Sequence, residues 1–298
     1  MTEKLLGKPV ADVIKAKNIE RAASFLEKAG AAPTLCVIRV GERDDDIAYE
    51  NSIVRVAAGV GVDVRTVGLA ADCNQEELIK AVSAASDDPL VHGILLFRPL
   101  PSHLDEKAAL GKIVPDKDVD GVTEPSMALL YEAKRPGTDC FLPCTAESVL
   151  QILLHYEVPL SGKKAVVIGR STVIGKPVSL LLLAHDATVT IAHSRTADLP
   201  AICREADILV CAAGMTAESA TGGLRGGVGR EFLSEKQVVI DVGIHADDEG
   251  NLFGDVDADA TPDFVAAYTP VPGGVGSVTT QLLLRHVIDA AEAAAGRN

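Results

Sequence analysis

Two glycines, Gly169 and Gly175, stand at a spacing that could bind a phosphate group. The apolar run at 165–168 is long enough for a buried strand, and the apolar segment 178–184 can be a core helix with Pro177 in its first turn. Strand, glycine turn and helix form the phosphate-binding half of a dinucleotide fold. The spacing G-x-S-x-x-x-G is not G-x-G-x-x-G, so the pattern also fits an ordinary turn in a parallel sheet.

The next predicted strand, 188–192, indicates which dinucleotide would bind. About 20 residues after the first glycine, an NAD enzyme usually carries an acid that holds the ribose hydroxyls. This strand ends instead in His193-Ser194-Arg195-Thr196. Hydroxyls and a cation suit a 2′-phosphate, so the sequence favours NADP. His193 is equally compatible with a loop position that has no role.

The rest of the sequence predicts an α/β architecture that would position the residues of this dinucleotide site. Further apolar strands are predicted at 208–213 and 238–242, which makes a parallel sheet in the second half. In the first half, strands at 34–40, 62–69 and 91–97 alternate with helices, and Asn74 and the acids 44–46 are predicted helix caps. Residues 268–277 are predicted to form a loop, and the final helix, 278–295, to pack on the first domain. The glycine-rich stretch 215–230 is predicted to be a mobile loop, either a cofactor lid or an insertion without function.

Composition limits the class of protein. With 298 residues and 47% hydrophobic content, two soluble domains are expected. A net charge of −14 argues against nucleic-acid binding, which needs a basic face. No long apolar run predicts a membrane helix or a signal peptide, and the six scattered cysteines predict a reduced, cytoplasmic protein without disulfides or a metal site.

Five motifs together resemble one family, the FolD-type bifunctional methylenetetrahydrofolate dehydrogenase/methenyltetrahydrofolate cyclohydrolases. They are P-D-K-D-V-D-G at 115–121, P-C-T at 143–145, G-R-S-x-x-I-G-K-P at 169–177, G-D-V-D at 254–257 and T-P-V-P-G-G-V-G at 269–276. The resemblance implies two α/β domains around a cleft, the second a Rossmann-like parallel sheet binding NADP, and a homodimer. It implies a folate-binding catalytic domain at 1–142 plus 279–298 and an NADP-binding domain at 143–278.

The resemblance also implies roles for individual residues. Asp120 would hold the pteridine ring and Tyr49 would stack on the folate, so these two are the candidate catalytic residues. Backbone of Pro270, Gly273 and Gly274 would contact the substrate. The residues expected to bind the cofactor are Gly169, Arg170, Ser171, Gly175, His193, Ser194, Arg195 and Thr196, with Arg170 and Ser171 facing the 2′-phosphate.

Two positions depart from the family pattern. The family reads Y-x-x-x-K with a catalytic lysine, where this chain has Ile53, and it reads Q-L-P-L-P where this chain has Phe97-Arg98-Pro-Leu-Pro. Arg55 lies roughly 200° away from Ile53 around an ideal helix. Arg98 and Lys117 are either substitutes for the lysine or ligands of a folate glutamate tail.

The chemistry separates the two family activities. Hydride transfer from methylene-tetrahydrofolate to a nicotinamide mainly needs positioning. Hydrolysis of the methenyl cation needs help with proton transfer, and Ile53 cannot give it. We therefore expect NADP-dependent oxidation of 5,10-methylene-tetrahydrofolate in one-carbon metabolism, with weak or absent cyclohydrolase activity. The alternatives are another Rossmann oxidoreductase of the amino-acid or shikimate dehydrogenase type, and a non-catalytic folate- or dinucleotide-binding protein.

Overall fold

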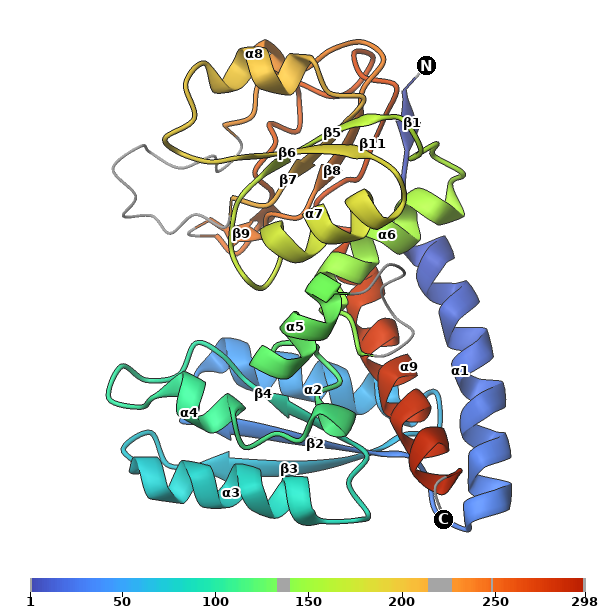
Figure 1. The fold of residues 1–298 in the computed structure, drawn as a ribbon, viewed down its shortest axis with the longest axis vertical. Helices are drawn as coiled ribbons and strands as arrows, with labels where there is room; N and C mark the ends of the chain where they lie inside the picture. The colour runs from blue at the N-terminus through green and yellow to red at the C-terminus, as the bar shows by residue number, and fades with distance from the viewer. Residues whose placement is uncertain (1, 133–139, 214–226, 248, 297–298) are drawn as a thin grey trace. The chain divides into compact units, whose positions relative to one another are not determined.

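The computed structural model describes residues 2–132, 140–213, 227–247 and 249–296 (Figure 1). They form two compact units. The six-stranded unit comprises Met1–Ala11 and Thr145–Thr279, and the three-stranded unit comprises Asp12–Cys144 and Thr280–Asn298. The predicted α/β class with parallel sheets is confirmed.

The three-stranded unit is built on a parallel sheet in the order β3-β2-β4. Its strands are β2 (Thr34–Val40), β3 (Asp63–Leu69) and β4 (Gly93–Leu96). Successive residues of a strand point to opposite faces of the sheet. The apolar residues of β2 therefore pack into two hydrophobic cores, one on each face. Leu35 and Val37 lie in one cluster with Ile53 and Phe97, whereas Cys36 and Ile38 lie in another with Leu78.

Helices cover both faces of this sheet (Figure 1). The helices that lie wholly or mostly in this unit are α1 (Gly7–Ala29), α2 (Asp44–Ala58), α3 (Gln75–Asp87), α4 (Glu106–Leu110), η1 (Pro115–Lys117), α5 (Glu124–Glu132) and α9 (Gly276–Ala295). Leu283, Leu284 and Val287 of α9 join the Ile53 cluster, which confirms that the final helix packs on this half of the chain.

The sequence predicted the N-cap residues of two helices, and one of these two predictions is correct. Asn74 caps α3 in a capping box with Glu77, as predicted. The prediction that acids 44–46 cap α2 is wrong, because the N-cap residue is Arg43, without a side-chain cap. The three aspartates occupy the first turn, where their charge favours the helix dipole.

The six-stranded unit contains a parallel sheet in the order β1-β11-β8-β7-β5-β6. Its strands are β1 (Glu3–Lys4), β5 (Lys164–Ile168), β6 (Thr188–Ala192), β7 (Ile208–Cys211), β8 (Val238–Asp241) and β11 (Ala267–Tyr268). The four strands predicted in this half are confirmed. The short strand β11 was not predicted, and Tyr268 therefore lies in a strand and not in the predicted loop.

The N-terminal residues also differ from the predicted division of the chain. The prediction placed 1–142 together, but β1 pairs with β11, so residues 1–11 belong to the six-stranded unit. The physical reason is main-chain hydrogen bonding, for example from Leu5 N–H to the Tyr268 carbonyl at 2.8 Å.

The remaining elements of this unit surround the sheet and its edges. They are α6 (Cys144–His155), α7 (Gly175–Ala184), α8 (Leu199–Arg204), η2 (Arg230–Phe232) and the antiparallel pair β9 (His245–Ala246) and β10 (Leu252–Phe253). Most of the glycine-rich stretch 215–230 lies outside the described residues. Among the described helices, none combines the length and hydropathy needed to span a membrane.

Candidate active site and dinucleotide site

The loop that carries Asp120 is held in place by two of its other charged residues. Lys117 Nζ donates to the carbonyl oxygens of Ser86 at 2.6 Å and Asp88 at 2.7 Å, at the end of α3. Asp118 is fully buried and accepts hydrogen bonds from Thr123 N–H at 2.8 Å and Ser126 Oγ at 2.6 Å. Lys117 is thus bound to helix carbonyls, which argues against its predicted role as a substitute for the lysine.

Asp120 occupies a partly desolvated position. Only 24% of its side chain is exposed, and burial raises the pKa of its carboxyl above the usual range. The Arg98 guanidinium opposes this rise in pKa; its Nη2 lies 3.5 Å from Asp120 Oδ2. The other end of Arg98, Nη1, is 3.6 Å from Glu106 Oε1. Sequence reasoning did not foresee this pairing of Arg98 with Asp120.

Tyr49 stacks on one of the two substituted positions. Its ring centroid lies 5.3 Å from that of Phe97, with 30° between the ring planes. Although 42% of Tyr49 is exposed, its hydroxyl is desolvated. This burial, reinforced by the negative charge of Asp120, raises the pKa of the phenol, and a hydrogen bond with Thr280 opposes the rise. Tyr49 and Asp120 are therefore neighbours.

The two departures from the family pattern lie in the same apolar cluster. Ile53 has no exposed surface and Phe97 is 6% exposed. Both belong to the core cluster that also contains Leu95 and Val119. Apolar side chains thus replace a cation and an amide beside Tyr49. Arg55 is exposed, which fits its position on another side of α2.

A buried histidine of α9 lies close to the loop that carries Asp120. His286 is 3% exposed, and its Nδ1 lies 2.8 Å from the Val119 carbonyl and 3.7 Å from Cys144 Sγ. Cys144 belongs to the P-C-T motif, and its hydrogen bond lowers the pKa of Asp120 against the effect of burial. The motif therefore brings a thiol, and α9 brings an imidazole, close to Asp120.

The glycine turn after β5 forms a backbone cradle. Gly169 has a φ of +133°, and a Cβ built there would lie 2.1 Å from the Ala212 carbonyl oxygen. A Cβ on Gly175 would lie 2.3 Å from the Gly169 carbonyl oxygen. Both positions therefore require glycine, and the backbone remains open to a phosphate at the N-terminus of α7.

The polar residues predicted to bind the cofactor gather at one edge of this sheet. Ile168 pairs with Ala192, so the turns after β5 and β6 are adjacent. Arg170 is exposed in the first turn, and His193–Thr196 form the second, closed by Thr196 Oγ1 accepting from His193 N–H at 2.9 Å. Ser171 Oγ accepts from the N–H of Ile174 at 3.1 Å and of Gly175 at 3.3 Å, so it organises the helix start.

A cavity of about 260 Å³ lies at the ends of β8 and β11 in the same unit. Pro270, Gly273 and Gly274, which the resemblance assigned to the substrate, line it together with Gly243 and Ile244. At its base, burial raises the pKa of Asp241 to about 6, although its carboxylate accepts three backbone N–H bonds. Asp241 was not among the predicted site residues.

The G-D-V-D motif supports this cavity from behind. Asp255, fully buried, accepts from Ala213 N–H at 2.9 Å and lies 2.8 Å from His245 Nε2. Its own N–H donates to Asp241 Oδ1 at 3.0 Å. The motif is therefore a structural brace of the strand ends, a role for which sequence alone gave no signal.

A Rossmann-like sheet with a glycine cradle in one unit and a polar site in a second α/β unit are the features of a dinucleotide-dependent oxidoreductase. Comparison with known families agrees. Residues 143–295 match the tetrahydrofolate dehydrogenase/cyclohydrolase NAD(P)-binding domain, and residues 5–120 match the catalytic domain of the same family.

Individual relatives cover almost the whole chain. A bifunctional protein FolD of Alkaliphilus oremlandii is 45% identical over 290 residues, which is 97% of each chain. The bifunctional FolD of Campylobacter jejuni matches with a TM-score of 0.90 at 33% identity, covering 98% of this chain and 99% of that one. Trypanosoma brucei FolD, solved with NADP cofactor and inhibitor, matches with a TM-score of 0.90 at 35% identity, covering 99% and 98%. The chain belongs to the tetrahydrofolate dehydrogenase/cyclohydrolase family.

Proposed function

We propose that this protein oxidises 5,10-methylene-tetrahydrofolate to 5,10-methenyl-tetrahydrofolate, with NADP as the hydride acceptor. The observation that carries the proposal is that one unit holds Tyr49 close to Asp120 and the other unit holds the glycine cradle, in a chain of this family. The C. jejuni and T. brucei relatives are both described as methylenetetrahydrofolate dehydrogenase/cyclohydrolases.

The residues of the six-stranded unit fit a dinucleotide. Gly169 and Gly175 leave the room that a Cβ would fill, and the N-terminus of α7 favours a phosphate there. Arg170 and Arg195 are exposed at the same edge, where a cation suits a 2′-phosphate, and no acid ends β6. Bound NADP would supply a hydride acceptor. The remaining work of this chain is to hold two rings in near-attack geometry and to exclude water.

The folate side of the reaction rests on the three-stranded unit. Asp120 is a carboxylate acceptor for the N–H groups of a pteridine, and Tyr49 offers an aromatic face. Methenyl-tetrahydrofolate is a cation, so a nearby carboxylate also stabilises the charge that develops as hydride leaves. None of these roles needs a proton-transfer group at position 53.

Hydrolysis to 10-formyl-tetrahydrofolate is the weaker activity in this proposal. Water that attacks the methenyl carbon must lose a proton, and Ile53 and Phe97 present only apolar surface beside Tyr49. Loss of a general base typically costs a factor of roughly 10² to 10⁴. We therefore expect methenyl-tetrahydrofolate to accumulate during turnover.

The family resemblance and the net charge also suggest where the protein acts, its oligomeric state and which partners it lacks. We propose a cytoplasmic homodimer that does not bind nucleic acid, since its net charge is −14. Sedimentation at several protein concentrations tests the dimer.

The direct test of function is NADPH formation from methylene-tetrahydrofolate and NADP by the purified protein. Turnover supports the proposal. Binding of folate and NADP without turnover would indicate a non-catalytic binding protein, and turnover of only other substrates would indicate a different oxidoreductase.

A further inference from the structure

Arg98 stands at the point where β4 runs into the candidate folate site. The family pattern has leucine here, so the charge is a feature of this chain. Its side chain is 18% exposed and lies between two carboxylates, Asp120 from the loop after η1 and Glu106 from the first turn of α4. The loop after η1 therefore contacts one nitrogen of the guanidinium and α4 contacts another.

In the described part of the chain, two other cations near this region contact groups other than Asp120. Lys117 Nζ donates to the carbonyls at the end of α3, and Lys107 Nζ pairs with Glu124 at 2.7 Å. Arg55 is exposed on α2. Arg98, in contrast, lies with its Nη2 3.5 Å from Asp120 Oδ2.

The groups around Asp120 explain why it needs a cation. Burial and the neighbouring Asp118 both raise the pKa of its carboxyl, while Arg98, Cys144 and His286 lower it. Arg98 has the largest lowering effect. Tyr49 from α2 faces the same carboxyl as a neutral phenol. A protonated Asp120 would offer a donor where a pteridine also presents N–H donors, so the ionised form is the one that binds.

We propose that Arg98 is a positioning residue of the folate site, which fixes the Asp120 carboxylate and keeps it ionised in place of the charge that the family carries at position 53. The inference rests on the proposed folate function. Arg98 acts through Asp120: Glu106 anchors the guanidinium, and the guanidinium in turn anchors the carboxylate.

The test measures binding of folic acid by calorimetry and KM for methylene-tetrahydrofolate, from weakly acidic to weakly alkaline pH. In the unmodified protein, the affinity for folic acid should fall at low pH, where Asp120 becomes protonated. This fall is the acid limb of the pH profile, and D120N should lack it. In R98L the limb should move to higher pH, and folate affinity at a pH on this limb should fall about tenfold. R98K should restore part of the affinity, and KM for NADP should not change in any of these variants.

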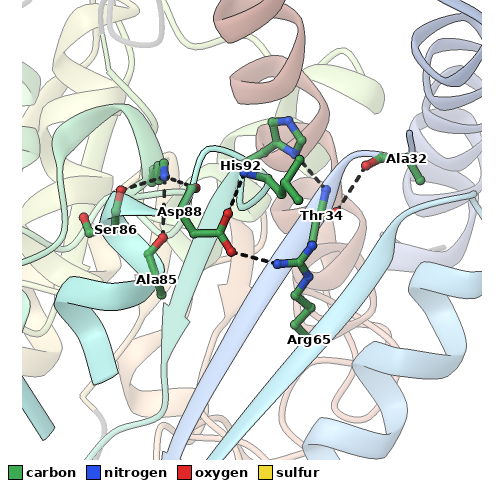
Figure 2. A network of polar contacts seen from close by, with 9 residues as sticks. Ala32, Thr34, Arg65, Ala85, Ser86, Asp88 and His92 are labelled. Atoms are coloured by element: carbon green, nitrogen blue, oxygen red, sulfur yellow. Dashed lines mark hydrogen bonds and ion pairs between the residues drawn. The ribbon is translucent and has the colours of Figure 1, made fainter. Parts of the chain in front are cut away.

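The matched control is R65L. Arg65 lies on β3 of the same unit and pairs with Asp88 at 2.8 Å (Figure 2), so its loss removes a charge of the same kind without touching Asp120. The limb should stay in place in R65L. If R98L fails to fold, R98Q is the second neutral variant, with the same expected shift.

The outcomes separate this inference from the proposed function. A wild-type protein that binds folic acid but does not reduce NADP overturns the dehydrogenase proposal and leaves the role of Arg98 measurable. A neutral Arg98 variant with unchanged folate affinity and an unshifted limb overturns the positioning role, even if turnover is normal. A shift of equal size in R65L also overturns it, because the effect would then be one of general charge.

Discussion

Restoring the two family residues, through the double change I53K and F97Q, should raise cyclohydrolase activity at a large cost in stability. Ile53 has no exposed surface and Phe97 is 6% exposed. Loss of the buried isoleucine removes about 1.5–3 kcal/mol of burial energy. A buried amine whose pKa drops by about three units adds about 4 kcal/mol.

The sum for I53K alone approaches the whole stability of a domain, which is about 5–15 kcal/mol. F97Q costs about 0.5–1.5 kcal/mol for the lost stacking on Tyr49, but it also gives the amine a hydrogen-bonding partner. A buried polar group left without a partner costs about 1–3 kcal/mol. The double variant should therefore lose less unfolding free energy than the sum of the losses in the two single variants.

The assay is the decay of methenyl-tetrahydrofolate absorbance, corrected for the uncatalysed rate, on variants whose urea unfolding has been measured first. Hydrolysis by the double variant should exceed that of either single variant and rise by roughly 10² to 10⁴ over the unmodified protein. The apolar pair I53M and F97L is the control, and it should stay folded without gaining hydrolysis. If the unmodified protein already hydrolyses the methenyl compound as fast as it oxidises the methylene compound, the reasoning is refuted.

Three further predictions concern other parts of the protein. R170A should weaken NADP affinity more than NAD affinity, and equal losses, or a wild-type preference for NAD in kcat/KM, would contradict the 2′-phosphate assignment. D120A should raise KM for folate by about 1.5–3 kcal/mol in free-energy terms while NADP affinity stays constant; the reverse pattern would refute the assignment of ligands to units. Because the folded protein holds the Asp241 proton with a pKa of about 6, the stabilisation from this group is complete below its unfolded pKa and is lost as pH rises through about 6. The unfolding free energy of the unmodified protein relative to D241N should therefore fall by about 3 kcal/mol over that range, and a constant difference would show that the pKa of Asp241 is not raised.

The sequence was most informative where a pattern is local. Strands β2 and β6 have the predicted bounds because their apolar runs end in glycine or in a polar cluster. The Asn74 cap needs only a partner three residues away. In contrast, β1 and β11 are two residues each, and their pairing joins opposite ends of the chain, so no local pattern marks them.

The site divides in the same way. Tyr49, Asp120 and the altered positions Ile53 and Phe97 could be found from motifs, and the structure places the first two beside each other. Which cation faces Asp120 could not be found, because it depends on how the loops after β4 and η1 approach each other. Lys117 and Arg98 looked equivalent in sequence, yet one caps a helix and the other pairs with Asp120.

Both units are assembled from segments at opposite ends of the chain, and this has a consequence for synthesis on the ribosome. Glu3 emerges early but must wait for its strand partner Ala267. The sheet around Leu35 and Val37 likewise lacks part of its core until Leu283, Leu284 and Val287 have been translated. Neither unit can complete its core before its late segment has been translated, so nascent intermediates expose apolar surface until then. Chaperone dependence of folding of the three-stranded unit should therefore end only after α9 has been translated.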